Sequence, residues 1–312
     1  MVSEDGRGLL AFPLEGLDDE EGQSVPEGID FVVDAHVHIF PDRIFDSIHK
    51  WFDQHAWPIR YRFTAASLLE FLLSRGISHI IALHYAHKPG IARELNAFVA
   101  EVCGRFDRVT GMATVYPGEP NAGEILREGF EAGLGGVKLH SHVQCFSMNS
   151  PEMEEVYQAC IAHDKPLIMH VGREPKSPAY PCDPYRFCNA GDLERVVRDH
   201  PDLRVCVPHL GTDEFSAYQR LIRTYDNLWL DTAMVLTDYL PQNPPPPPLS
   251  EWRIDRIMYG TDFPQIPYAW DRELKILAAA PGLTPEELAK ISGRNAVEFF
   301  GLESFLPQSH PA

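Results

Sequence analysis

Phe31-Val32-Val33-Asp34-Ala35-His36-Val37-His38 is an apolar run that ends in two histidines. Residues i and i+2 of a strand point to the same face, so His36 and His38 can project together from the end of one strand. Two imidazoles that converge in this way make half of a metal site. Whether a complete site exists then depends on the ligands that later strands supply.

The composition is that of a globular protein large enough to bury a substantial core. The chain has 312 residues, 44% of them hydrophobic, and a formal net charge of −18 at pH 7. Such an acidic chain should repel nucleic acid and anionic membrane surfaces, which argues against both as partners. We expect no membrane helix, because no apolar run approaches ~20 residues. The N-terminus lacks the pattern of a signal peptide, and the cysteines are scattered, which together predict a cytoplasmic protein with reduced thiols.

Strands and helices alternate along the chain from residue 30 onward. We predict a loose acidic leader over residues 1–29, a single barrel domain over 30–303 and a tail over 304–312. Alternating strands and helices imply parallel strands with right-handed crossovers. Eight strand-helix units fit the α/β class and a (β/α)8 TIM barrel, whose usual size is about 250 residues. The alternative is a doubly wound open sheet, and the lack of a Gly-x-Gly-x-x-Gly motif after the first strand weakens it.

Polar side chains end five of the predicted strands. They are His36 and His38 on the first strand, Lys138 and His140 on the fourth, His170 on the fifth, His209 on the sixth and Asp262 on the eighth. Each is a weak signal by itself, because a histidine at a strand end is more often structural and an aspartate there is more often a helix N-cap. Together they are hard to explain as packing. All lie at the carboxyl ends of strands, the face where barrel enzymes keep their active sites.

The strand-end motifs resemble those of the amidohydrolase superfamily. The resemblance rests on Asp34-Ala35-His36-Val37-His38, Lys138-Leu139-His140, Met169-His170, Pro208-His209-Leu210-Gly211, Tyr259-Gly260-Thr261-Asp262-Phe263-Pro264 and Ile291-Ser292-Gly293-Arg294-Asn295-Ala296. It spans residues 31–302 and is greatest for the branch that includes aminocarboxymuconate semialdehyde decarboxylase. The motifs indicate a metal-dependent barrel enzyme, and they are not specific for a substrate.

The resemblance implies metal-binding and catalytic roles. The implied metal ligands are His36, His38, His170 and Asp262, with Lys138 and His209 added where a second metal is bound. Such a set suits Zn²⁺, and it is also compatible with Mn²⁺ or Fe²⁺. Asp262 would transfer the proton, and His209 would orient the reacting water. One metal is favoured over two, because the decarboxylase-like branch has no carboxylated lysine bridge at the position of Lys138.

Two further residues are candidates for substrate binding. Arg173 follows His170 by three residues, and a guanidinium there would hold a substrate carboxylate in a bidentate pair. A pair with Glu174 or another acidic side chain is the equal alternative. His140 shares the inward face with Lys138 and could bind a substrate oxyanion. The expected partner is therefore a small molecule, with a carboxylate as one candidate group, and the sequence leaves open whether the chain forms a homo-oligomer.

Three hypotheses for the function remain at this point. The leading expectation is a metal-dependent hydrolase that uses metal-activated water on an amide, ester or lactone of a small molecule. The alternative is a metal-dependent, non-oxidative decarboxylase, which the same ligands would serve. The third is a non-catalytic metal-binding barrel, which predicts a missing ligand or base, whereas every member of the pattern is present.

Overall fold

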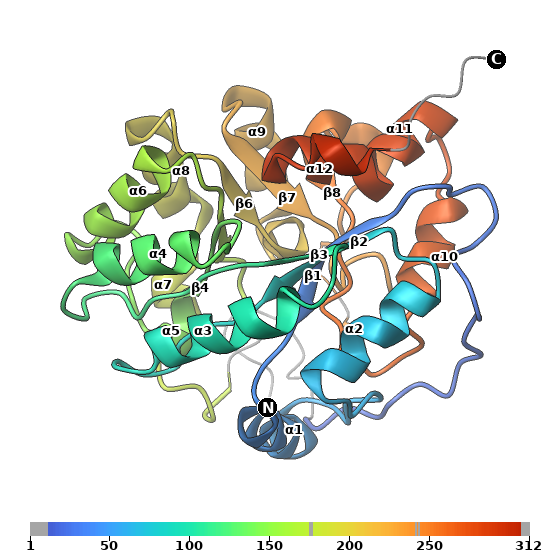
Figure 1. The fold of residues 1–312 in the computed structure, drawn as a ribbon. Coiled ribbons are helices and arrows are strands. Elements are labelled where there is room, and N and C mark those ends of the chain that lie inside the picture. The colour runs from blue at the N-terminus through green and yellow to red at the C-terminus, as the bar shows by residue number, and fades with distance from the viewer. Residues whose placement is uncertain (1–11, 175–176, 241, 243, 307–312) are drawn as a thin grey trace.

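A closed barrel of eight parallel strands forms the centre of the computed structural model, which describes residues 12–174, 177–240, 242 and 244–306 (Figure 1). The strands are β1 (Val33–His38), β2 (His79–Leu83), β3 (Val109–Gly111), β4 (Val137–His140), β5 (Leu167–His170), β6 (Val205–Val207), β7 (Leu228–Asp231) and β8 (Ile257–Met258). They pair in the orders β1-β2-β3 and β4-β5-β6-β7-β8. Parallel bridges from Ala113 to Val137 and from Val37 to Phe263 close the two seams. The predicted (β/α)8 barrel is confirmed.

Helices surround the strands in Figure 1. They are α1 (Asp42–His55), α2 (Ala65–Ser74), α3 (Ala92–Cys103), α4 (Ala122–Glu131), α5 (Ser141–Gln144), α6 (Glu152–Ala162), α7 (Pro184–Phe187), α8 (Ala190–Asp199), α9 (Phe215–Thr224), α10 (Arg272–Ala278), α11 (Pro285–Ala289) and α12 (Asn295–Phe300), with a π-helical turn at Lys290–Arg294 between the last two. Thr64 caps α2 by accepting a hydrogen bond from the backbone N–H of Ser67. Within the described residues, no helix is both long and apolar enough to cross a membrane.

Side chains on the strands alternate between two apolar layers. On β5, Leu167 and Met169 pack in the large core between strands and helices, whereas Ile168 belongs to the smaller core inside the barrel. His170 has the same phase as Ile168, because side chains two residues apart share a face. The same alternation on β4 puts Leu139 in the outer core and leaves Lys138 and His140 on the inner face. Strand phase therefore directs these polar groups into the mouth of the barrel.

One extra residue on β1 shifts this alternation. Val33 and Asp34 pair with His79 and Ile80, but the next pairs are Val37 with Ala82 and His38 with Leu83. Such a β-bulge moves all later side chains to the opposite face of the strand. Val33 and Ala35 thus pack inside the barrel before the bulge, and His36 and His38 point into it after the bulge. The strand β1 includes both histidines.

The segment before β1 makes several contacts with the barrel domain. The backbone N–H of Gly22 donates to Asp271, and the carbonyl of Gly22 accepts from the indole of Trp270. Asp19 pairs with Arg60 at 2.7 Å. Residues 1–11 of the predicted leader and 307–312 of the predicted tail lie outside the described residues, so the proposed division of the chain stays a prediction. All six cysteines are free thiols.

Candidate active site

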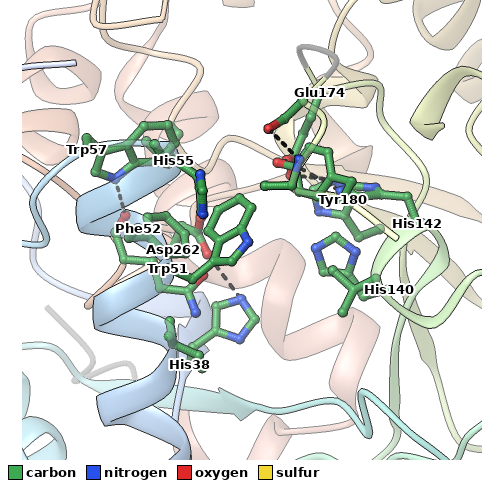
Figure 2. Close-up of a pocket in the computed structure, with 18 of the residues that line it drawn as sticks. His38, Trp51, Phe52, His55, Trp57, His140, His142, Glu174, Tyr180 and Asp262 are labelled. Atoms are coloured by element: carbon green, nitrogen blue, oxygen red, sulfur yellow. Dashed lines mark hydrogen bonds and ion pairs between the residues drawn. The ribbon is translucent and has the colours of Figure 1, made fainter. Parts of the chain in front are cut away.

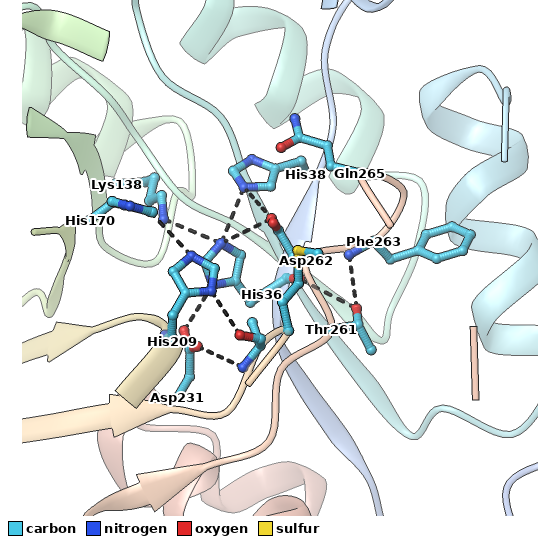
Figure 3. Close-up of polar contacts among 12 residues, drawn as sticks. His36, His38, Lys138, His170, His209, Asp231, Thr261, Asp262, Phe263 and Gln265 are labelled. Carbon is cyan, nitrogen blue, oxygen red and sulfur yellow. Dashed lines mark hydrogen bonds and ion pairs between the residues drawn. The ribbon is translucent and has the colours of Figure 1, made fainter. Parts of the chain in front are cut away.

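Three donor atoms converge at the carboxyl end of the barrel (Figure 3). The Nε2 atoms of His36 and His38 are 3.1 Å apart, and Oδ1 of Asp262 lies 3.1 Å from His38 Nε2 and 3.5 Å from His36 Nε2. Donors bound to one ion at about 2.0–2.2 Å would lie roughly 3.0–3.5 Å from one another. The three residues are buried and fit a single divalent cation.

The protonation of the two histidines also fits a metal. His36 Nδ1 lies 2.8 Å from Oδ2 of Asp231, which fixes the proton on Nδ1 and leaves the lone pair of Nε2 facing His38 and Asp262. Burial, together with the charge of Lys138, holds the pKa of both His36 and His38 well below the usual value. Both rings are therefore neutral, as metal binding requires.

The backbone after β8 is shaped to bring Asp262 to this point. Gly260 passes so close to β1 that a Cβ atom on it would lie 2.8 Å from the Cβ of His36, which only glycine avoids. Asp262 has a φ of 68°, in the left-handed region that aspartate tolerates better than most residues. The buried carboxylate of Asp34 accepts hydrogen bonds from the hydroxyl and backbone N–H of Thr261, which anchors the turn to β1. Burial raises the pKa of Asp262 to about 7.

The other predicted ligands lie beside this group. Lys138 Nζ is 3.4 Å from His36 Nε2, and burial lowers the pKa of Lys138 to about 8. His209 donates from Nδ1 to the carbonyl of Ala233, which turns its Nε2 towards Nδ1 of His170 at 3.2 Å. The structure thus brings all six predicted metal ligands to one end of the barrel. The role of His170 as a fourth ligand stays a prediction.

A second polar cluster lies next to His170 and is centred on Glu174. The carboxylate of Glu174 is 3.2 Å from Nε2 of His170 and 3.4 Å from Nε2 of His142, and it accepts a hydrogen bond from the hydroxyl of Tyr180. Burial disfavours the charged form of His142, but the neighbouring Glu174 outweighs it and raises the pKa of His142 to about 10. His140 stacks on His170, with ring centroids 4.0 Å apart. These four residues, His140, His142, His170 and Glu174, have donor atoms close enough to hold a cation, although the ion pair between Glu174 and His142 already accounts for the contact.

Arg173 lines the same cavity but is engaged by the chain itself. Its Nε donates to the carbonyl of Cys188 at 3.0 Å, and its terminal nitrogens lie 3.4 Å from Glu214 and 3.8 Å from Asp213. The guanidinium also lies over the ring of Tyr185, 5.0 Å from its centroid. A substrate carboxylate would have to compete with two carboxylates for this arginine.

A cavity of about 330 Å³ lies next to the candidate metal ligands, and His38 and Asp262 line it (Figure 2). Most of its wall is apolar or aromatic and comes from α1, from the loops after β1, β2 and β7, and from the segment around Tyr180. These residues are Phe40, Ile44, Ile48, Trp51, Phe52, Trp57, Tyr85, Tyr180, Pro181, Met234, Val235 and Leu240. The rings of Trp51 and Tyr180 stack with centroids 5.3 Å apart. His38 and Asp262 lie on one side of this space in Figure 2, and His140, His142 and Glu174 lie on the other.

The roles of several of these residues were not predicted from the sequence. Asp231 is a polar residue at the end of the seventh strand, which is the same pattern as at the other strand ends. Its role becomes clear only from its contact with His36 in the structure. Glu174 follows His170 by four residues and was considered only as a partner of Arg173. The contribution of Trp51 and Tyr180 has no local signal, because it depends on how α1 packs over the barrel.

A family model for amidohydrolases matches residues 33–302. The chain belongs to the amidohydrolase family. The match covers all eight strands of this amidohydrolase and both motifs that supply its convergent donor atoms, and it confirms the resemblance seen in the sequence. A comparison with curated proteins found no match.

Solved structures with the same fold include two named decarboxylases. The 5-carboxyvanillate decarboxylase of Novosphingobium aromaticivorans, complexed with manganese and 4-hydroxy-3-methoxy-5-nitrobenzoic acid, is 18% identical; the match covers 90% of this amidohydrolase and 100% of that chain, with a TM-score of 0.63. The 2,6-dihydroxybenzoate decarboxylase from Rhizobium is 19% identical over 88% of this chain and 100% of that chain, with a TM-score of 0.62. A TIM-barrel protein of Bordetella bronchiseptica is 20% identical over 86% of this chain and 98% of that chain, with a TM-score of 0.64.

The comparison corrects the expectation of hydrolysis. The activities named for the two decarboxylases are decarboxylations of aromatic acids and not the hydrolysis of an amide, ester or lactone. The error came from the ligand set, which serves both reactions and therefore does not separate them. What holds at the coarser level is that the chain is an enzyme of the amidohydrolase superfamily with grouped histidine and aspartate side chains that fit a metal.

Proposed function

We propose that the chain is a metal-dependent, non-oxidative decarboxylase of a small aromatic carboxylic acid. The observation that carries the proposal is the position of the His36, His38 and Asp262 donors at the end of an aromatic-walled cavity. A flat, apolar ring fits such walls, while its carboxylate reaches the donors. The named activities of the two decarboxylases of similar fold support the same choice.

Non-oxidative decarboxylation needs few groups from the protein. The bond between the ring and the carboxylate breaks, CO₂ leaves, and a proton takes its place on the ring carbon, so no oxidant or reductant is required. A bound divalent cation would supply positive charge for holding the carboxylate and the charge that develops on the substrate. His36, His38 and Asp262 would hold that cation, with His170 as a fourth ligand. Mn²⁺ and Zn²⁺ both suit these donors, and we propose one ion per chain.

Proton transfer falls to side chains at the same end of the cavity. Asp262 and His209 both line it, and each can carry a proton. His209 keeps its Nδ1 proton bound to the carbonyl of Ala233, so its exchangeable position is Nε2. We assign the transfer to Asp262, because its carboxyl group lines the cavity beside His38 and burial raises its pKa to about 7. The apolar walls would keep bulk water from the reacting carbon.

The test of this function is CO₂ release by the full chain loaded with Mn²⁺ or Zn²⁺. We expect release from 2,6-dihydroxybenzoate or a related 2-hydroxybenzoate, with the matching phenol as the second product. The chelated protein and the His36→Ala variant are the controls, and both should be inactive while remaining folded by circular dichroism. Absence of CO₂ from a panel of hydroxybenzoates, with metal verified in the protein, would overturn the proposal.

The metal content is tested separately by elemental analysis of the purified, dialysed protein. One equivalent per chain is expected, because the other group of convergent donors among the described residues already contains the ion pair between Glu174 and His142. Two equivalents would show that a second ion is bound and would remove this part of the proposal.

A further inference from the structure

Most charged groups around the cavity already have partners within the protein. Asp262 lies among the metal ligands, and the carboxylate of Glu174 is shared by His142, His170 and Tyr180. Arg173 is the only arginine or lysine among the described lining residues. Its position therefore decides how many negative charges a bound molecule can carry.

Arg173 is already paired within the protein and is not free to bind a negatively charged ligand group. Glu214 and Asp213 supply two carboxylates, the carbonyl of Cys188 accepts from Nε, and the ring of Tyr185 covers one face of the guanidinium. The side chain is 23% exposed, and the side chain of Glu214 is 20% exposed. Because the pair is mostly shielded from solvent, a ligand carboxylate would have to displace it rather than add to it.

The rest of the described wall offers no second arginine or lysine for another negative charge. Trp51 and Tyr180 stack on each other, and Phe40 and Tyr85 meet at 5.2 Å between ring centroids, next to His38. Beyond them the described wall combines aliphatic side chains with uncharged hydroxyl and amide groups and two further imidazoles, those of His55 and His87, and it includes no second arginine or lysine. A carboxylate placed against such a wall loses much of its hydration and gains no permanently charged partner, which is unfavourable.

We infer that this enzyme selects aromatic acids that carry a single carboxylate, with an apolar or uncharged substituent at the far end of the ring. The inference rests on the proposed function, because the one carboxylate is the group placed at the metal ligands. It also separates this chain from an enzyme whose substrate is a dicarboxylate, as the name 5-carboxyvanillate implies for one protein of similar fold. Arg173, Glu214 and Asp213 are the residues that set this selectivity.

The experiment compares two ligands that differ only at the distal position. They are 5-methylsalicylate and 5-carboxysalicylate, offered to the metal-loaded full chain. Binding is read from tryptophan fluorescence in a stopped-flow instrument, since Trp51 lies in the wall, and CO₂ release is measured apart from it. We expect the methyl compound to bind about 30-fold more tightly, because the second carboxylate loses hydration without gaining a permanently charged partner. Equal binding, or tighter binding of the dicarboxylate, would overturn the inference.

A variant tests whether Glu214 is the reason. Glu214→Gln keeps an oxygen for the backbone N–H of Ala190 but removes one carboxylate from Arg173. The preference for the methyl compound should fall by about tenfold, because the guanidinium becomes available. The matched control is Glu194→Gln, which removes the partner of Arg220 away from the cavity and should leave the preference unchanged. An unchanged preference in Glu214→Gln would contradict the part assigned to Arg173.

Two further arms separate the possible failures. Lys176 lies outside the described residues, so Lys176→Gln is measured in parallel. If the preference for the methyl compound grows in this variant, Lys176 is a cation that binds the second carboxylate, and the inference is overturned. If the 30-fold binding preference holds but no acid releases CO₂, the proposed function fails and the single-carboxylate selectivity stands. If CO₂ is released most efficiently from the dicarboxylate, the function stands and the selectivity fails.

Discussion

Nδ1 of His36 lies 2.8 Å from Oδ2 of Asp231, and both side chains are buried. The other oxygen of Asp231 accepts hydrogen bonds from the backbone N–H groups of His209 and Ala233. One carboxylate at the end of β7 therefore sets the tautomer of a metal-binding imidazole and also holds the backbone of the sixth strand end. Carboxylates in this position orient metal-bound histidines and raise their basicity.

We predict that Asp231→Asn weakens metal binding by about 10–100-fold without unfolding the chain. The single amide oxygen of the variant stays with His209 and Ala233, so its NH₂ group faces His36 Nδ1 and drives the proton to Nε2. Affinity is measured by competition with a chelator. Asp53→Asn, which removes only the exposed pair with Arg62, is the control and should bind metal as the parent does. An affinity unchanged in Asp231→Asn would mean that this carboxylate does not act through His36.

Asp262→Asn should separate the proton-transfer role from folding. General acid–base catalysis typically contributes about 10²–10⁴-fold, so we expect kcat for CO₂ release to fall within that range even when excess metal restores occupancy. Steady-state kinetics at saturating Mn²⁺ measure this, and elemental analysis reports the residual metal. A variant that is fully metal-loaded and retains the parent kcat would transfer the proton role to His209.

Strand phase made much of the site predictable. On β4 and β5 the two-residue repeat and the position of the last apolar residue place Lys138, His140 and His170 on the inner face, as the structure confirms. The β-bulge on β1 did not have to be known, because His36 and His38 are two residues apart on the same side of it. Their shared direction is a local property, and local properties are readable from sequence.

The rest of the site depends on contacts between distant segments. The role of Glu174 depends on its ion pair with His142, which lies in α5 after a different strand. The amphipathic pattern of α1 predicts a helix with a buried face, but not that this face covers the cavity and meets Tyr180. The sequence also did not distinguish hydrolysis from decarboxylation. The metal ligands determine which ion binds, whereas the cavity wall determines which substrate binds and which of its bonds reacts.

His84 makes the stability of the fold depend on pH. Its Nε2 is hydrogen-bonded to Oδ1 of Asn96 in the core, and burial lowers its pKa from 6.5 to about 4. The unfolded chain binds a proton at this residue between pH 6.5 and 4 while the folded chain does not, so the free energy of unfolding falls as the pH drops through that window. Each pKa unit corresponds to about 1.4 kcal/mol, which makes the loss about 3–4 kcal/mol at most.

The variant His84→Gln keeps a donor for Asn96 and removes the titrating group. We expect its stability, measured by urea unfolding from pH 6.5 to 4.5, to fall less steeply than that of the parent. His163→Gln, at an exposed position, should keep the parental slope. Identical slopes for the parent and His84→Gln would show that His84 is not protonated differently in the folded and unfolded chains.

Trp51 and Tyr180 close one side of the cavity by stacking across two segments far apart in the sequence. We predict that Trp51→Leu raises KM for an aromatic acid by about tenfold and leaves kcat nearly unchanged, since an aromatic contact is worth about 0.5–1.5 kcal/mol beyond the area it buries. An interaction made equally in the ground and transition states changes KM alone. Trp51→Phe should restore most of the affinity, because it keeps a ring for the stack. A loss of kcat at constant KM, or the same KM in the leucine and phenylalanine variants, would show that the ring of Trp51 does not contact the substrate.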